Sequence, residues 1–336
     1  MKRSRITQRE VARAAGVSQA TVSMVLGEGK AGSLPGETYQ RVLTAASALG
    51  YVPNRSAQAL KTSRTMTVAC VVPDVANPFY PLLMRGVQAA ADKAGYDVTA
   101  INTDGSEVRE RRFLDWSLRG AIDGIVGVFF TLRALDFAPL VAAGICVARI
   151  ETGAKRGGAM PIDDLFVDNF AAARAATGYL IEKGHRQIAM IAGLGGPEAK
   201  RTSGYLHAIA EAGLRQELVS CGEFNEENGY RTTLEVLKAS PRPTAIFAAN
   251  DLMALGAMTA IREVGLAIPN NVALMGFDDI FAARVVTPSL STVKQFQYDL
   301  GRAAAEMLLE RLNALPPNTP GRGREMPFEI VRRSSA

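Results

Sequence analysis

The amino-acid sequence predicts a small all-α head of the helix-turn-helix type, joined to an α/β body of two doubly wound lobes. Three observations support this fold class. Two short amphipathic segments flank a glycine near the N-terminus, and after residue 65 the pattern changes to apolar runs that alternate with amphipathic segments. The chain has 336 residues, which is enough for two or three domains.

The composition is that of an ordinary globular protein, with 48% apolar and 21% charged residues. The three cysteines lie far apart, no C-x-x-C pair occurs and there are two histidines, so neither a metal site nor another cofactor is expected. This cysteine usage favours a reducing compartment. No apolar segment follows the basic N-terminus or reaches the length of a membrane-spanning helix, and we therefore expect a cytoplasmic protein.

Charge is distributed unevenly along the chain. Residues 1–65 hold ten lysines and arginines against three glutamates, a balance of +7, whereas the remainder holds 28 basic and 30 acidic residues, a balance of −2. A basic head on a slightly acidic body is expected when only the head binds a polyanion, although a solvated basic terminus would have the same composition.

The head is predicted to contain three helices. Thr7 and Glu10 fit a capping box at the start of the first helix, and Gly16 supplies the positive φ that ends it. Ser18 caps a second helix, and a third helix over residues 37–49 closes a small apolar core. This arrangement is a helix-turn-helix, whose second helix places its first side chains at base edges in the major groove of DNA.

The body contains continuous apolar runs of the kind that form buried parallel strands: TVACVV, DVTAIN, GIVGVFF, ICVARI, QIAMIAG, TAIFAAN and VALMGF. The segments between them have helical periodicity, and several end at a glycine. Because strand and helix alternate, the body is expected to be doubly wound, and a break near Pro161 suggests two lobes.

Ligands of such sheets lie beyond the carboxyl ends of the strands, and the polar residues at those ends are Asp74, Asn77, Glu151, Asn250, Asp251, Asp278 and Asp279. Carboxylates and amides suit bidentate hydrogen bonds to vicinal hydroxyls. The alternative role of each side chain is a helix cap or a hydrogen bond between lobes. Arg149, inside an apolar strand, could pair with Glu151 or meet an anionic ligand.

The segments VARAAGVSQATVSMVL, NPFY, KGHRQIA, AIFAANDLMALGA and VALMGFDD follow one another along nearly the whole chain, and the sequence resembles the lactose-repressor (LacI/GalR) family of bacterial transcription regulators. The resemblance implies a non-enzymatic, sequence-specific DNA-binding repressor. It also implies a body with the fold of periplasmic sugar-binding proteins, which binds a small polar effector such as a sugar between its lobes. The implied partners are a second copy of the chain and a pseudo-palindromic duplex operator.

The domains that the resemblance implies are a helix-turn-helix domain over 1–53, a hinge helix or linker over 54–65, and an effector-binding core over 66–336. Within the core, the N-lobe covers about 66–163 and 294–325, and the C-lobe covers about 164–293 and 326–333.

The DNA-binding residues implied by the resemblance and the caps are Thr7, Ser18, Gln19, Ala20, Thr21, Ser23, Met24, Asn54, Arg55, Ala57 and Leu60. Met24 stands where the family often has arginine, so an arginine contact with guanine is missing there. Leu60 matches the apolar wedge that the family inserts between base pairs in the minor groove. The implied effector-binding residues are Asn77, Phe79, Glu151, Arg201, Phe224, Asn250 and Asp278.

Other signals have simpler interpretations. We expect GLGGP, from Gly193, to be a flexible loop rather than a phosphate loop. We expect IDDLFVD, from Ile162, to be a solvated linker and helix start rather than a two-metal site. His185 is expected to be structural. A periplasmic binding protein would need an export signal, and a sugar-using enzyme would need a nucleophile–base pair. The last residues, RRSSA, contain no leucine heptad, which favours a dimer.

Overall fold

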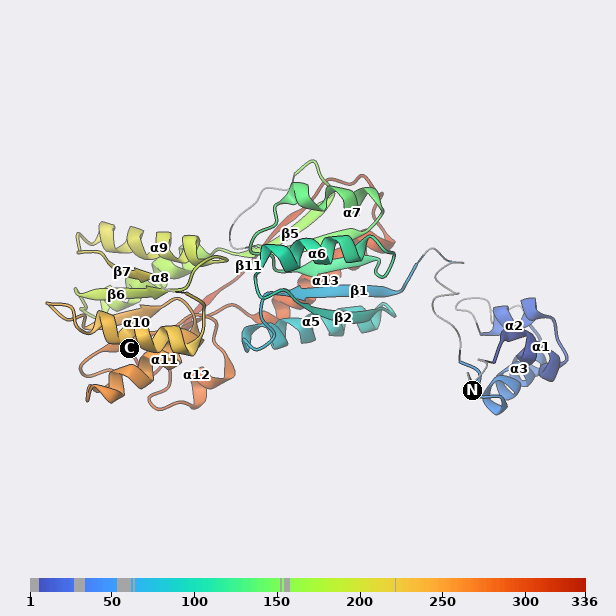
Figure 1. The fold of residues 1–336 in the computed structure, drawn as a ribbon, viewed down its shortest axis with the longest axis horizontal. Helices are drawn as coiled ribbons and strands as arrows, with labels where there is room; N and C mark the ends of the chain where they lie inside the picture. Colours follow the sequence, from blue (N-terminus) through green and yellow to red (C-terminus); the bar gives the residue numbers. More distant parts are fainter. Residues whose placement is uncertain are drawn as a thin grey trace. The chain divides into compact units, whose positions relative to one another are not determined.

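The structure is a computed structural model that describes residues 6–26, 34–52, 62, 64–151, 153, 158–220 and 222–336. The chain separates into two compact units, Met1–Thr65 and Met66–Ala336, which Figure 1 draws as ribbons. In the described ranges, no helix is both long enough and apolar enough to span a membrane.

The head consists of the helices α1 (Gln8–Ala15), α2 (Gln19–Val25) and α3 (Gly36–Ala48). Glu10 closes the start of α1 by accepting the backbone N–H of Thr7 at 2.7 Å, and Gly16 ends the helix with φ +64°. Leu49, the last residue of the predicted third helix, is the C-cap of α3 and is 37% exposed. The fully buried core residues of the three helices are Val11, Val22 and Val42.

The first lobe of the body is built on a six-stranded parallel sheet with the strand order β11-β5-β4-β3-β1-β2. Its strands are β1 (Thr67–Val72), β2 (Asp97–Asn102), β3 (Gly124–Gly127), β4 (Cys146–Glu151), β5 (Ile162–Val167) and β11 (Gly323–Met326). Its helices are α5 (Phe79–Lys93), α6 (Glu107–Ser117), α7 (Ala138–Ala142), α13 (Gln297–Asn313) and the short 3-10 helix η2 (Ala134–Phe137). Apolar clusters join α5 and α13 to one face of the sheet, and α6 and α7 to the other.

The second lobe is built on a four-stranded parallel sheet with the order β7-β6-β8-β9. Its strands are β6 (Ile188–Ala192), β7 (Glu217–Ser220), β8 (Ala245–Ala248) and β9 (Ala273–Met275). Its helices are α8 (Asn169–Glu182), α9 (Glu198–Glu211), α10 (Glu226–Val236), α11 (Asp251–Glu263) and α12 (Phe281–Val285). The helices α8 and α9 cover one face, and α10 and α11 cover the other (Figure 1). An antiparallel pair, β10 (Thr292–Lys294) and β12 (Glu329–Val331), adjoins β9 through an isolated bridge.

The chain passes between the lobes after β5, between β10 and α13, and between β11 and β12. The predicted first boundary between 163 and 164 is therefore wrong, because β5 belongs to the first sheet as far as Val167. The carboxyl ends of the parallel strands of each lobe lie at one sheet edge, where the loops that carry the predicted ligand-binding residues begin.

The prediction that the segment from Ile162 is a solvated linker is also wrong, because β5 is buried along its whole length. The helix start predicted at its end is confirmed, because Asp168 caps α8 by accepting the N–H of Ala171 at 3.0 Å. The aspartates of β5 are buried because arginines pair with them. Asp163 accepts hydrogen bonds from Arg311 of α13 at 2.5 and 3.1 Å and from Arg322 at 2.8 Å. Burial raises the pKa of Asp163, but the hydrogen bonds from the two arginines outweigh that effect and lower the pKa.

Candidate ligand site and nucleic-acid interface

The start of α2 is the part of the head that is suited to reading DNA. Gln19 and Ala20 are exposed, and Met24 is half-buried one turn further on. Ser18 caps the helix by accepting the N–H of Thr21 at 3.0 Å, which fixes the first turn. A short helix that presents exposed side chains at a capped N-terminus has the form of a recognition helix.

The remaining predicted DNA contacts fall into two groups. Thr7 is exposed at the N-cap of α1, and Ser23 is half-buried on α2. The hinge predictions lie outside the described residues and stay predictions: Asn54, Arg55, Ala57 and Leu60.

The substitution Gln19→Ala is expected to relax base preference more than it weakens overall DNA binding, because the amide is lost while the phosphate contacts remain. Arg9 Nε lies 3.5 Å from Gln19 Oε1 and helps to orient that amide. Discrimination at one base pair of each half-site should fall by about 1–3 kcal/mol. Competition with duplexes that differ at single positions measures it. The control Gln40→Ala, exposed on α3, should keep the preference, and an equal change in both variants would refute the assignment.

Arg201 is the centre of the candidate ligand site in the second lobe. Its side chain is 6% exposed and lies over the ring of Phe277, with the guanidinium carbon 3.7 Å from the ring centroid. Its nitrogens donate to Asn169 Oδ1 at 2.8 Å and to the carbonyl of Ala249 at 2.5 Å, and one lies 3.6 Å from Asp278 Oδ1. Burial lowers the pKa of Arg201, and Asp278 opposes that effect. The guanidinium is therefore held in one orientation before any ligand binds.

Asn250 and Phe224, two of the predicted effector-binding residues, lie next to each other, and Asn250 has a structural role. Its Oδ1 accepts the N–H of Met253 at 2.8 Å and caps α11, and its Nδ2 donates to the carbonyl of Phe224 at 3.1 Å. The ring of Phe224 lies against Gly193, where a built Cβ would be 2.6 Å from it. The absence of a side chain at Gly193 therefore allows the ring to occupy its position.

Asp278 follows β9 with φ +125°, a conformation that non-glycine residues rarely adopt. Its Oδ1 accepts from Gln295 at 2.7 Å, and its carbonyl accepts from Gln297, the first residue of α13. Burial raises the pKa of its carboxyl to about 7, although Arg201 opposes the rise. Asp278 thus links Arg201 to the segment that returns to the first lobe.

The first lobe contributes Tyr80, beside the predicted Phe79, to the surroundings of Arg201. Burial raises the pKa of Tyr80, the charge of Asp278 raises it further, and that of Arg201 lowers it. Phe79 packs edge-on against Tyr80, with ring centroids 5.1 Å apart. Just before α5, Asn77 accepts the N–H of Phe79 at 3.0 Å.

Glu151, at the end of β4, is engaged by a buried arginine of its own strand. Arg149 NH1 lies 2.9 Å from Glu151 Oε1, as an ion pair rather than an aligned hydrogen bond, and NH2 lies 2.7 Å from Asp164 Oδ1. Of the two roles considered for Arg149, the structure therefore shows pairing with Glu151. Two carboxylates surround one guanidinium, so this cluster has no excess positive charge for an anionic ligand.

Among the residues of this region that sequence reasoning missed are Tyr80, Phe277 and Gln295. Tyr80 and Phe277 each adjoin a predicted residue in the sequence, and their position in NPFY and in VALMGFDD was the available signal. Gln295 had no such signal, because its contact with Asp278 depends on how the chain returns between the lobes.

The stability of the body is expected to fall as the pH rises from about 4 to about 7, because the folded pKa of Asp278, about 7, lies above its ordinary value of 3.8. The folded state then binds the proton more tightly than the unfolded state, and this contribution is lost as the pH rises through about 7. Asp278→Asn should weaken the pH dependence of the melting temperature, and the neighbouring Asp251, whose pKa burial raises to about 6, should account for part of what remains. Asp299→Asn, an exposed change on α13, should keep the wild-type dependence, and an unchanged Asp278→Asn profile would contradict the assignment.

Comparisons with known proteins agree with this geometry. Residues 7–54 match the family model described as bacterial regulatory proteins, lacI family, and residues 177–336 match a periplasmic binding protein-like domain. A relative from Clostridium saccharobutylicum, the HTH-type transcriptional regulator RegA, is 32% identical over 97% of this chain and 98% of its own.

Two solved structures are similar along almost the whole chain. The lac repressor dimer bound to operator and the anti-inducer ONPF has a TM-score of 0.86 and 25% identity, and the match covers 99% of both chains. The complex of the transcriptional regulator CelR with cellobiose has a TM-score of 0.71 and 29% identity, over 99% of this chain and 100% of that one.

A helix-turn-helix head and a two-lobed α/β body with a polar site where the lobes meet define a DNA-binding transcription regulator with an effector-binding domain. The predicted fold class and regulator function are confirmed. The chain belongs to the lacI family of bacterial transcription regulators.

Proposed function

We propose that this protein is a cytoplasmic, homodimeric repressor that binds a pseudo-palindromic operator and responds to a neutral sugar or sugar derivative bound where the lobes meet. The observation that carries the ligand proposal is the orientation of Arg201, which is buried, stacked on Phe277 and paired with Asp278. A fixed guanidinium with a neighbouring carboxylate suits the paired donors and acceptors of vicinal hydroxyls.

The choice of a neutral ligand follows from the charges near the site. Arg201 is paired with Asp278, and Arg149 is shared by Glu151 and Asp164. Aromatic rings at Phe79 and Phe224 add the apolar surface that covers a sugar face. The solved CelR–cellobiose complex, with its similar fold, supports the same class of ligand.

In this proposal, base contacts come from Gln19, Ala20 and Met24. Thr21 and Ser23 contact the phosphates of the DNA backbone. A two-fold dimer would present two such helices to two half-sites, and the lac repressor dimer on its operator supports this arrangement. In the hinge, Arg55 would contact phosphate and Leu60 would open a base step. We propose no catalytic role, because regulators of this family act by binding.

A thermal-shift screen tests the ligand proposal. Cellobiose, other neutral mono- and disaccharides and nucleosides would be added to the full chain. One of them should raise the melting temperature, since a ligand at 100 times its Kd adds about 2.7 kcal/mol to the stability of the native state. Failure of every neutral compound, or a response only to their phosphate esters, would overturn the proposed ligand class.

A further inference from the structure

The ring of Phe130 joins the two lobes on the side of the body where β3 and β6 end. Phe130 follows β3 in the first lobe. A Cβ built on Gly196, in the loop between β6 and α9 of the second lobe, would lie 2.6 Å from two atoms of that ring. Real Cβ atoms do not approach so closely, so the ring occupies the space that a side chain at residue 196 would need.

The backbone around Phe130 is held in place by a buried carboxylate of its own lobe. Glu110 of α6 is fully buried, and its carboxylate accepts the backbone N–H groups of Phe130 at 2.7 Å, Thr131 at 3.0 Å and Leu132 at 3.2 Å. It also accepts the Thr131 hydroxyl at 2.5 Å. Because four donors share one buried carboxylate, the loop cannot withdraw from the second lobe without losing charge-assisted hydrogen bonds. A Cβ built on Gly105 would also lie 2.8 Å from the Phe130 ring, so the ring packs against Gly105 of its own lobe as well.

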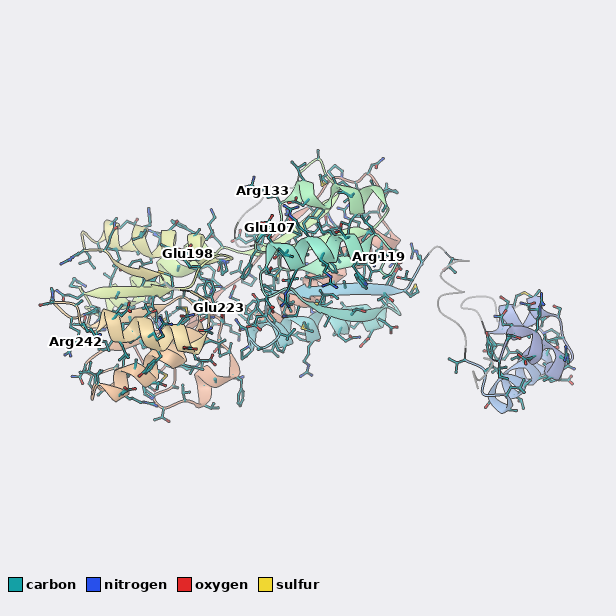
Figure 2. The ribbon with its side chains drawn as sticks, in the orientation of Figure 1. Glu107, Arg119, Arg133, Glu198, Glu223 and Arg242 are labelled. Carbon is teal, nitrogen blue, oxygen red and sulfur yellow. The ribbon has the colours of Figure 1, made fainter. Side chains whose placement is uncertain are left out.

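The opposing loop is connected to the ligand site. Its first glycine, Gly193, contacts the ring of Phe224, and its last residue, Pro197, accepts the backbone N–H of Arg201 at 3.1 Å. Figure 2 shows Glu198, at the start of α9, on the end of the second lobe that faces the first, and Glu107 and Arg133 on the facing end of the first lobe. One short loop therefore contacts Phe130 of the first lobe and two residues of the predicted ligand site.

We propose that the contact between Phe130 and Gly196, called here the latch, sets how far the two lobes close over the ligand site. The lack of a side chain at residue 196 allows the closed arrangement, and the anchored ring limits it. A ligand changes the balance between open and closed lobes only through its different affinity for the two, so the latch regulates the ligand response of the proposed function.

The sequence offers a matched pair of substitutions that separates the contact from backbone strain. Gly195 and Gly196 both have positive φ, +81° and +55°, so alanine is strained at either position. A Cβ at Gly195 has nothing within 4 Å, whereas one at Gly196 meets the Phe130 ring. If the latch limits closure, Gly196→Ala separates the lobes and Gly195→Ala does not.

The distance between spin labels on the two lobes measures closure in the full chain without ligand or DNA. Labels would be placed on Val108→Cys, 77% exposed on α6, and on Ser203→Cys, exposed on α9. Cys146 and Cys221 would be replaced by serine. Cys70 can stay, because burial raises the pKa of its thiol to about 12 and keeps it unreactive.

Double electron–electron resonance should show a longer distance, by several ångströms, in Gly196→Ala and an unchanged distance in Gly195→Ala. In a Phe130→Ala background, Gly196→Ala should have no further effect, because the ring that it meets is gone. The proposal is overturned if Gly195→Ala acts like Gly196→Ala, or if Gly196→Ala has the same effect with and without Phe130. These outcomes need no ligand, so they are separate from failure of the thermal-shift screen.

Discussion

Arg201→Ala is expected to remove the response to the ligand identified by the screen while leaving DNA binding without ligand intact. The arginine is buried, and its donors are held by Asn169, Ala249 and Asp278. Alanine removes charge-assisted hydrogen bonds to the ligand, which should cost about 2–4 kcal/mol of binding, or roughly a thirtyfold to thousandfold rise in Kd. No residue of the head is altered, so the variant should bind operator and ignore ligand.

Arg174→Ala is the control, because it removes an arginine of the same lobe whose ion pair with Glu211 is about half exposed. It should keep the wild-type ligand affinity in isothermal titration. Circular dichroism and thermal melting would confirm that both variants fold. Wild-type ligand affinity in Arg201→Ala would mean that the ligand binds elsewhere.

Asp163→Ala is expected to destabilise the body by about 3–5 kcal/mol, because it leaves a buried arginine without its carboxylate. Asp163 is fully buried, and Arg311, 3% exposed, donates to it from two nitrogens. Arg311 and Arg322 also hold the carbonyls of Thr319, Pro320 and Met307, so the loop before β11 depends on the same cluster. Urea unfolding measures the loss as a lower midpoint.

Glu310→Ala belongs to the same cluster and gives the matched comparison. Glu310 pairs with Arg322 at 2.6 Å but is 51% exposed, so its removal should cost less than about 1 kcal/mol. The buried position of Asp163, rather than its charge alone, is then responsible for the larger loss. Similar unfolding midpoints for the two variants would show that this buried cluster does not stabilise the body as inferred.

The parts of the structure that could be predicted from sequence are those whose signals are local. Thr7, Glu10 and Gly16 mark the start and end of α1 within a few residues of chain. Most of the apolar runs predicted buried parallel strands correctly, because a strand covered on both faces is mostly apolar. The run DVTAIN is the exception: it forms β2 at the edge of its sheet and is half-buried to exposed. Motif matching placed Arg201 and Asp278 in one site, and the two side chains do lie 3.6 Å apart.

The parts that could not be predicted depend on residues far apart in the chain. The two adjacent aspartates of β5 led to the prediction of a solvated linker, because Arg311, which pairs with the buried Asp163, comes 148 residues later in the chain. The same limit hid the contact of Gln295 with Asp278 and that of Phe130 with Gly196. Asn250 shows a different limit: its amide caps α11 and also donates to the carbonyl of Phe224 in the candidate site, and sequence reasoning treated a cap and a site contact as alternatives.

The proposed function requires that this protein binds a specific operator and that a small polar ligand changes that binding. Selection from random duplexes with the full chain, followed by fluorescence anisotropy on the enriched duplex, tests it directly. We expect an inverted repeat, an affinity that falls steeply with salt, and a change in affinity of about 5- to 150-fold when the ligand is added. Enrichment of no sequence, or an operator affinity that the ligand leaves unchanged, would contradict it.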